Sequence, residues 1–377
     1  MRAIVTGQIG VDKKPFLEEV CNTAGERGSA IDIFNVGSMM YDEAPDVRAG
    51  RILDLPLSRL ASLRRAAFKD IISESSPVEE HPNIIVNTHA TFRWRHGLFS
   101  AFDFDQMSLL KPDMMICLVD NVETVHHRLH QEHDIDAKLK DCMVWREEEI
   151  LATELLANAM GCHDQFYILS RGRQNDNIET CMRLVTRPDL RKVYPSFPMS
   201  HVVDKPDVLK EIDDFRASIA EHFIAFDPAD VDEKLLLDLA LDAARNGEDW
   251  IRLEEHTFGG RKDSSPQKVS VMDVLDIAGD IDGQIYMRDF KLIDQSEMII
   301  SFIPELEGGV PGLSSGVERE LHHAWEHTKE VYVVWKPAKA PSPFITETAT
   351  KIFPTVDDAL GYFEEQGMFA QRNLFGH

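Results

Sequence analysis

A glutamate at the start of a predicted helix is the strongest candidate for chemistry in this chain. Glu320 belongs to the segment SSGVERELHHA at 314–324, which lies between two apolar runs at 298–303 and 331–335. Strand, small-residue turn, helix and strand form the βαβ pattern, whose helix N-terminus binds anions through free backbone N–H groups. A carboxylate in the first turn of such a helix suggests a phosphorylated substrate that the glutamate attacks or polarises. Alternatively, Glu318 and Glu320 merely favour the positive end of the helix dipole.

Two further segments of the second half suit the same chemistry. The segment YPSFPMS at 194–200 follows a predicted strand and gives a second small-residue turn that can face a phosphate. Asp289 lies in an Arg-Asp-Phe segment shortly before the apolar run at 298–303. Two aspartates of this region, Asp289 and Asp294, could supply a proton to a leaving group.

Another candidate site opens the chain. The segment GQIGVDKK at 7–14, here called the phosphate loop, follows an apolar run and precedes a predicted helix, as phosphate-binding loops do. Its backbone amides would cradle phosphates while Lys13 reaches the terminal ones. Asp12 stands where a glycine normally precedes the lysine, and Lys14 replaces the hydroxyl residue that normally holds Mg²⁺. We therefore expect ATP or another nucleotide at this loop, with Mg²⁺ an open option that lacks its usual ligand.

Short apolar runs alternate with helical stretches in both halves. In the first half we expect strands at 3–6, 31–36, 83–88, 114–119 and 165–169, and helices at 15–24, 57–72 and 147–160. The pattern breaks near 186–188, and a new unit starts at 191–194, followed by helices at 208–221 and 234–245. This predicts an α/β protein with two domains, 1–189 and 190–377, each a parallel sheet between two layers of helices. The segment at 256–267 reads as an exposed loop, either a lid or a plain insertion.

Composition limits the class of partner. A net charge of −25 over 377 residues argues against a nucleic-acid polymer, because phosphate backbones would be repelled. The five cysteines are scattered without a CxxC pair, so neither a disulfide framework nor a metal site is indicated. No apolar run is long enough to span a membrane, and the first residues read as a strand rather than a signal peptide. We expect a cytoplasmic protein that acts on small-molecule nucleotides.

Several short motifs of the first half follow one another in a definite order. They are FNVGSMM at 34–40, RILD at 51–54, VNTHAT at 86–91, LKPD at 110–113 and HRLHQE at 127–132. In these motifs the first half resembles the archaeal type of adenylate kinase over nearly its whole length. The resemblance implies a P-loop kinase-like fold, ATP at the phosphate loop and an acceptor nucleotide held partly by Arg51.

The family's arginine-rich lid follows the position of Arg128, but residues 134–143 of this chain contain no arginine. Phosphoryl transfer depends on cations and positioning, so two readings stay open: nucleotide binding without efficient transfer, and an active nucleoside monophosphate kinase with an accessory domain. The third possibility is that this half is a relic scaffold. The nucleotide-binding residues on this reading are Gly7, Gly10, Lys13, Lys14, Arg51, His89 and Arg128.

The second half resembles the nucleoside 2-deoxyribosyltransferase superfamily, which has a flavodoxin-like fold, and most closely its deoxynucleoside 5′-monophosphate N-glycosidases. The segments at 194–200, 288–290 and 314–324 carry the likeness. It implies that Glu320 attacks or stabilises the anomeric carbon, that Asp289 holds the sugar or transfers a proton, and that Tyr194 lies near the sugar. It also implies a homo-oligomer. The substrate- and phosphate-binding residues on this reading are Ser196, Ser200, Ser314, Ser315 and Gly316.

The leading hypothesis is an enzyme whose second domain breaks the base–sugar bond of a nucleotide or nucleoside, by hydrolysis or by transfer to another base. Its first domain then binds a nucleotide. The alternatives are the active kinase and a nucleotide sensor without turnover, for which phage defence is a guess from the architecture alone.

Overall fold

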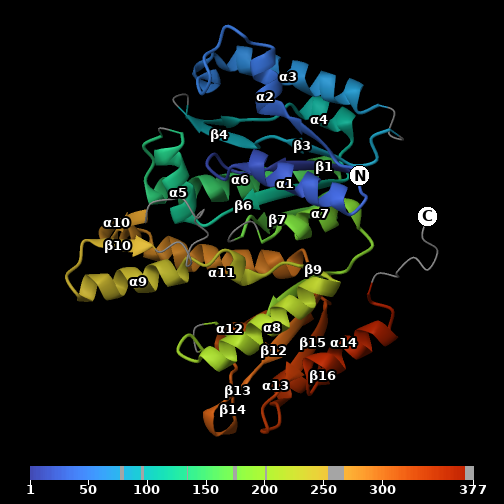
Figure 1. Ribbon diagram of the computed structural model, residues 1–377, viewed down its shortest axis with the longest axis vertical. Helices are drawn as coiled ribbons and strands as arrows, with labels where there is room; N and C mark the ends of the chain where they lie inside the picture. Colours follow the sequence, from blue (N-terminus) through green and yellow to red (C-terminus); the bar gives the residue numbers. More distant parts are fainter. Residues whose placement is uncertain are drawn as a thin grey trace. The chain divides into compact units, whose positions relative to one another are not determined.

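The computed structural model describes residues 1–76, 80–94, 97–133, 135–172, 176–199, 202–253 and 267–369. The chain divides into two compact units, and each is described by itself. Unit 1 combines Met1–Thr186 with Asp230–Ile285, and unit 2 combines Arg187–Ala229 with Tyr286–His377. Figure 1 shows the elements of both, coloured along the sequence.

The sheet of unit 1 has five parallel strands in the order β2-β3-β1-β6-β7. All six residues of β6 are buried, as expected for a parallel sheet covered on both faces. The chain continues from β1 to β2 and β3 on one side and to β6 and β7 on the other, so the phosphate loop after β1 occupies the switch point where α/β sheets bind ligands. The strands are β1 (Arg2–Thr6), β2 (Asp32–Asn35), β3 (Ile84–Asn87), β6 (Met114–Val119) and β7 (Phe166–Ser170).

Helices cover both faces of this sheet. Ile4, Val86 and Met115 point into a core built with α3 and α6. Because alternate residues of a strand face opposite ways, Ala3 and Val5 point to the other face, where α1 packs against α7. The helices are α1 (Lys13–Glu26), α2 (Val36–Asp42), α3 (Leu57–Glu74), α4 (Phe104–Leu110), α5 (Val122–Gln131), α6 (Leu139–Met160) and α7 (Ile178–Thr186). The antiparallel strands β4 (Thr91–Trp94) and β5 (Gly97–Ser100) follow β3.

The interval 230–285 packs with the first unit although it follows the predicted boundary near residue 190. Buried polar contacts fix it there: Asn177 donates to the Asp230 carboxylate at 2.7 Å, and Arg146 pairs with Glu233. Gln284 also accepts a hydrogen bond from Arg146 at 2.7 Å. The interval contains α9 (Lys234–Arg245), β10 (Trp250–Leu253), β11 (Gln267–Ser270), α10 (Val271–Asp276) and the start of α11 (Ala278–Asp294). The compact units therefore do not follow one continuous division at residue 190.

Unit 2 also contains five parallel strands, in the order β9-β8-β12-β15-β16. Numbered along the unit this is 2-1-3-4-5, the flavodoxin-like order, whose switch point lies between β8 and β12. In the register of this pair Tyr194 is opposite Ile299, and Ser196 is opposite Ser301. The strands are β8 (Lys192–Ser196), β9 (Ile224–Ala225), β12 (Met298–Ile303), β15 (Glu330–Trp335) and β16 (Lys351–Phe353).

The two faces of the second sheet differ in character. Val193, Ile300 and Phe302 point into an apolar core shared with helices α8 and α14. Tyr194 and Ser196 therefore point to the opposite face, on the side of α12, which contacts β12 and β15. The remaining elements are α8 (Pro206–His222), β13 (Glu305–Leu306), β14 (Val310–Pro311), α12 (Ser315–Glu326), α13 (Pro343–Thr346) and α14 (Val356–Glu365).

The fold class predicted from the sequence, α/β with two parallel sheets, is confirmed. The strands at 114–119 and 298–303 and the helix at 234–245 have the predicted bounds. Helix α6 begins at Leu139 rather than at 147, and the helix α11 that carries Asp289 was not predicted. Of the loop expected at 256–267, residues 256–266 lie outside the part of the chain that the structure describes. Among the helices that the structure describes, none is both long and apolar enough to cross a bilayer.

The buried contact between Arg146 and Glu233 gives a test of how the interval 230–285 is held. Replacing Arg146 with alanine leaves the buried carboxylate of Glu233 without its cation and removes the nearby positive charge from the buried carboxyl group of Glu123. We expect Arg146→Ala to lower the free energy of unfolding of unit 1 by about 3–5 kcal/mol, measured by urea denaturation. Arg59→Ala, which breaks an exposed pair with Asp46, should change it little. Equal losses in the two variants would contradict this account.

Candidate functional site

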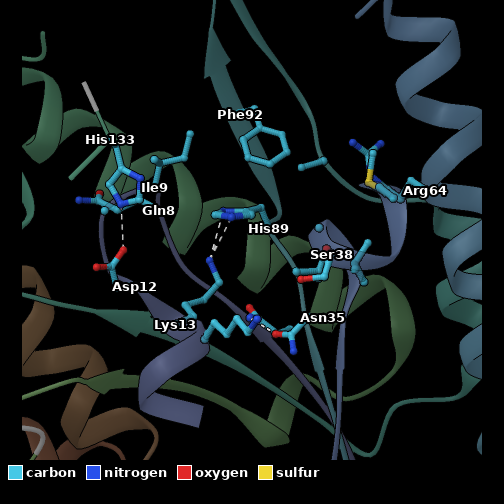
Figure 2. Close-up of a pocket in the computed structure, with 18 of the residues that line it drawn as sticks. Gln8, Ile9, Asp12, Lys13, Asn35, Ser38, Arg64, His89, Phe92 and His133 are labelled. Carbon is cyan, nitrogen blue, oxygen red and sulfur yellow. Dashed lines mark hydrogen bonds and ion pairs between the residues drawn. The ribbon is translucent and has the colours of Figure 1, made fainter. Parts of the chain in front are cut away.

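A cavity of about 260 Å³ lies between the phosphate loop, the ends of β2 and β3, and helices α2 and α3 (Figure 2). Three cationic side chains border it, Lys13, Lys14 and Arg64. Asp12, Asn35, Asn87, His89 and His133 also border it. A concave space beside a glycine-containing loop at a switch point is where a phosphorylated ligand is expected.

The ammonium group of Lys13 is held at the loop itself. Its Nζ donates to the carbonyl oxygen of Gly7 at 2.7 Å and lies 3.2 Å from Nε2 of His89 (Figure 2). Burial lowers the pKa of Lys13 to about 8, against the opposing charge of Glu149. Burial, and then the charge of Lys13, lower the pKa of His89 well below its usual value, so this imidazole is neutral. The hydrogen bond to Gly7 therefore holds Lys13 at the loop, while burial makes its ammonium group lose its proton at a lower pH than usual.

Glu149 of α6 joins the phosphate loop to the segment after β3. Its carboxylate accepts hydrogen bonds from the backbone N–H of Gly7 at 3.0 Å and of Ala90 at 2.8 Å. It also accepts from the backbone and hydroxyl of Thr91, at 2.8 and 2.7 Å. One buried carboxylate thus fixes both segments that carry Lys13 and His89. The sequence analysis missed Glu149, because nothing in a helical stretch shows which of its acids points inward.

Asp12 has a left-handed backbone, with φ 54° and ψ 55°, where glycine is usual. Its Oδ1 lies 3.0 Å from Nε2 of His133. Burial alone would raise the pKa of Asp12, but the hydrogen bond with His133 and the charge of Arg128 outweigh it, and the pKa is lowered. An ionised carboxylate therefore borders the cavity at a strained position.

Two predicted nucleotide-binding arginines do not border the cavity. Nη1 of Arg128 donates to Asp120 at 2.8 Å and to the carbonyl oxygens of Gly10 and Val11 at 3.3 Å, so it supports the phosphate loop from behind. Arg51 is half exposed and lies 3.8 Å from Asp54. Direct contact of these side chains with a nucleotide stays a prediction that this geometry does not favour.

Of the other predicted residues of the loop, Lys14 and Gly10 border the cavity and Gly7 does not. Lys14 borders the cavity and is largely exposed, 3.9 Å from Glu18. Gly10 borders the cavity, whereas the N–H of Gly7 is already bonded to Glu149. A side chain at Gly7 would come within 2.5 Å of the Leu118 carbonyl oxygen, so this position requires glycine.

Arg64 was not predicted as a site residue, yet it is a buried cation with an unbonded nitrogen at the cavity. Only 4 % of it is exposed, and its Nη2 has no hydrogen-bond partner among the described residues. Burial lowers its pKa to about 10, against the charge of Asp103, so the guanidinium remains charged at neutral pH. Figure 2 shows it on the α3 side of the cavity, with Lys13 and His89 on the loop side. A buried cation without a bonded partner favours an anionic ligand.

Comparison with known proteins agrees with this geometry for the first half. Residues 6–142 match the model of a family described as an AAA domain. Over 196 residues the chain is 26% identical to an adenylate kinase of Pyrococcus furiosus, which covers 50% of this chain and 94% of that protein. The N-terminal region is a P-loop kinase-like domain. A crystal structure of shikimate kinase from Bacteroides thetaiotaomicron is also similar, at 12% identity and a TM-score of 0.31, covering 48% of this chain and 94% of that one.

A second cluster of reactive groups lies at the switch point of unit 2. The hydroxyl of Tyr194 donates to Oε1 of Glu320 at 3.1 Å, and Ser196 donates to Oε2 at 2.6 Å. Ser301 of β12 donates in turn to Ser196 at 3.4 Å. Burial raises the pKa of Glu320, although the hydrogen bonds from Ser196 and Tyr194 oppose the rise. The structure thus brings Tyr194, Ser196 and Glu320 together, while the roles predicted for them stay predictions.

Asp289 lies near this cluster, on α11. The pKa of Tyr194 is raised well above its usual value by burial, then by the charge of Glu320 and next by that of Asp289. The alternative acid, Asp294, is instead exposed and lies 2.8 Å from Nε2 of His323. Of the two candidate proton donors, Asp289 is the one whose charge acts on Tyr194, which makes it the stronger candidate.

The start of α12 differs from the prediction. The helix begins at Ser315, so Glu320 lies in its second turn and not in its first. The hydroxyl of Ser314 caps the helix by accepting from the N–H of Val317 at 3.2 Å, which explains where the helix starts. Ser315 and Gly316 are exposed in the first turn, and Ser200 lies outside the described residues. The phosphate-binding roles of these residues stay predictions.

The lowered pKa of Lys13 predicts how anion binding depends on pH. Free Lys13 loses its proton near pH 8, so its attraction for a phosphate is present below pH 8 and is lost above it. The affinity for ATP, measured by calorimetry, should fall by up to about tenfold for each pH unit above 8. Lys13→Met should bind ATP more weakly and flatten this dependence. A wild-type affinity that stays constant through this range would contradict the assignment.

Proposed function

We propose that unit 2 cleaves the N-glycosidic bond of a nucleotide or nucleoside, with Glu320 as the group that acts on the anomeric carbon. One observation carries the proposal: Tyr194 and Ser196 each donate to one oxygen of a partly buried Glu320 carboxylate at the switch point of the sheet. Two donors hold the carboxylate in a single orientation, which positions one oxygen for attack. The desolvated environment strengthens its interaction with a developing positive charge.

The chemistry divides between two acids. The C1′–N bond breaks and its electron pair leaves with the base, which takes a proton from the acid form of Asp289. Glu320 stabilises the cationic sugar or forms an ester bond at C1′. A water molecule then attacks C1′, the ester bond breaks, and the proton of the water returns to Asp289. If a second base attacks in place of water, the reaction is a deoxyribosyl transfer.

The N-terminus of α12 suits the phosphate of such a substrate. Its first-turn residues Ser315 and Gly316 are exposed, and a side chain added at Gly316 would meet only Ser314, at 3.6 Å. Free N–H groups at a helix N-terminus bind phosphate. The second-turn position of Glu320 then separates the carboxylate from the phosphate by about one helical turn, roughly 5 Å. Resemblance of this unit to oligomeric enzymes also makes a homo-oligomer part of the proposal.

Glu320→Gln tests the proposal and keeps the size of the side chain. Base release from a panel of nucleoside 5′-monophosphates and deoxynucleosides, followed by mass spectrometry, should fall by at least about 10²-fold. Glu326→Gln is the matched control, because Glu326 is exposed at the other end of the same helix and should leave the rate unchanged. Release that is equal in wild type and Glu320→Gln would refute the proposal.

We also propose that the cavity of unit 1 binds a nucleotide and transfers phosphoryl groups poorly. Lys13, Lys14 and Arg64 supply positive charge around one cavity, which supports binding. The position of Lys14 lacks a magnesium-binding hydroxyl, and Asp12 adds negative charge beside the phosphate, both of which disfavour the kinase transition state. ADP formation from ATP and AMP that is abolished by Lys13→Ala would favour the active kinase instead.

A substitution of Arg64 tests whether the phosphate of the nucleotide lies beside this side chain. A charge-assisted hydrogen bond from a buried arginine should make AMP bind more tightly than adenosine by about 10- to 100-fold. Arg64→Met should remove this difference while adenosine still binds. It should also raise the melting temperature of the free protein, since an unpaired buried charge is lost.

The matched control is Arg65→Met, which removes the neighbouring exposed arginine that pairs with Asp103. It should keep the preference for AMP. If Arg64→Met retains the preference for AMP over adenosine, Arg64 does not bind the phosphate.

A further inference from the structure

We propose that Asp12, Glu132 and His133 form a divalent-metal site beside the phosphate loop, with a preference for a transition metal such as Mn²⁺ over Mg²⁺. The metal would join the loop to a bound phosphate. Its role with a nucleotide rests on the nucleotide binding proposed above, but binding of the metal itself does not.

Three side chains of suitable chemistry converge at one place. Each offers one ligand atom, and these atoms all lie within 4.8 Å of one another. Nε2 of His133 is already 3.0 Å from Oδ1 of Asp12 (Figure 2). Glu132 and His133 are consecutive at the end of α5, and both are exposed, so their side chains are able to rotate. Ligand atoms about 2.0–2.2 Å from a metal lie roughly 3 Å apart, which small rotations would achieve.

The type of ligand indicates the type of metal. One imidazole nitrogen with two carboxylate oxygens suits Mn²⁺, Fe²⁺ or Zn²⁺, whereas Mg²⁺ prefers oxygen ligands alone. Three protein ligands leave coordination positions open for water or for an oxygen of the ligand. The site therefore resembles one that binds a substrate group rather than a closed structural site.

The location of the site explains an otherwise unfavourable residue. Asp12 occupies a left-handed backbone position that favours glycine. Its carboxylate and His133 border the same cavity as Lys13. Without a cation, Asp12 and Glu132 would repel a phosphate at this loop. With a dication they would attract it, because the metal is then the largest local charge.

The same coordination would compensate for Lys14. The hydroxyl that usually binds Mg²⁺ is missing at that position, so a metal carried by the loop of a nucleotide-binding protein needs other ligands. Metal and nucleotide would then increase each other's affinity by the same factor, because coupling between two sites is reciprocal.

A rival cluster must be separated from this one. Asp294, His323 and His327 also offer ligand atoms within 4.8 Å of one another. They belong to unit 2 and are absent from the residues that border the cavity. His327→Gln removes a ligand of this cluster and is the matched control for His133→Gln.

The test measures metal binding to the full chain without nucleotide, by the electron paramagnetic resonance signal of free Mn²⁺. We expect His133→Gln and Glu132→Gln each to weaken Mn²⁺ binding at least about tenfold, and His327→Gln to retain a site of wild-type affinity. Mg²⁺ should compete only at much higher concentration. In the presence of Mn²⁺, wild type should bind ATP more tightly than His133→Gln does.

Three other outcomes would overturn the metal site. No Mn²⁺ binding, or binding lost only in His327→Gln, shows that His133 and Asp12 form an ion pair alone. Mg²⁺ that competes equally with Mn²⁺ refutes the imidazole ligand. If Mn²⁺ binds as expected but ATP does not bind at all, the metal site stands and the proposed nucleotide binding fails.

Discussion

The candidate site of unit 1 depends on one buried carboxylate. Glu149 accepts hydrogen bonds from the loop after β1 and from the segment after β3, which also meet directly through Lys13 and His89. Parallel strands bring their carboxyl ends to one edge, but they do not fix the distance between the loops that follow. Glu149 fixes it, and thereby sets how Lys13 meets His89. Burial lowers the pKa of both cations of the cavity, so Lys13 loses its charge near pH 8 whereas Arg64 keeps its charge to about pH 10.

In unit 2 two neutral hydroxyl groups, rather than a buried acid, fix the arrangement of the candidate site. Tyr194 and Ser196 come from the same strand and the same face, two residues apart, so a single register places both against Glu320. The hydrogen bonds oppose the effect of burial on the pKa of this carboxyl group. In unit 1 an acid organises backbone groups, whereas in unit 2 hydroxyl groups organise an acid.

The sequence predicts the sheets better than the sites. Strands such as 114–119 and 298–303 are continuous apolar runs, and burial on both faces of a parallel sheet requires that pattern. Tyr194 and Glu320 were candidates from the sequence, because Tyr194 lies near the end of one strand and Glu320 in a helix that follows another, but the hydrogen bond between them was not predicted. Glu149 and Arg64 were not, because each lies in a long helix whose inward-facing side depends on distant packing. The places of Arg51 and Arg128 show the converse: a motif identifies a residue, while its local partners decide where the side chain points.

The return of the chain to unit 1 after residue 229 affects how this protein is made. During synthesis the strands of the first sheet emerge early, yet Arg146 and Asn177 meet their partners only after residues 230–284 have left the ribosome. Until then the guanidinium of Arg146 and the amide of Asn177, which are both buried in the finished unit, lack their acidic partners Glu233 and Asp230. The first fold therefore matures late, and a gene fragment cut at the apparent end of its last strand and helix would encode an incomplete protein.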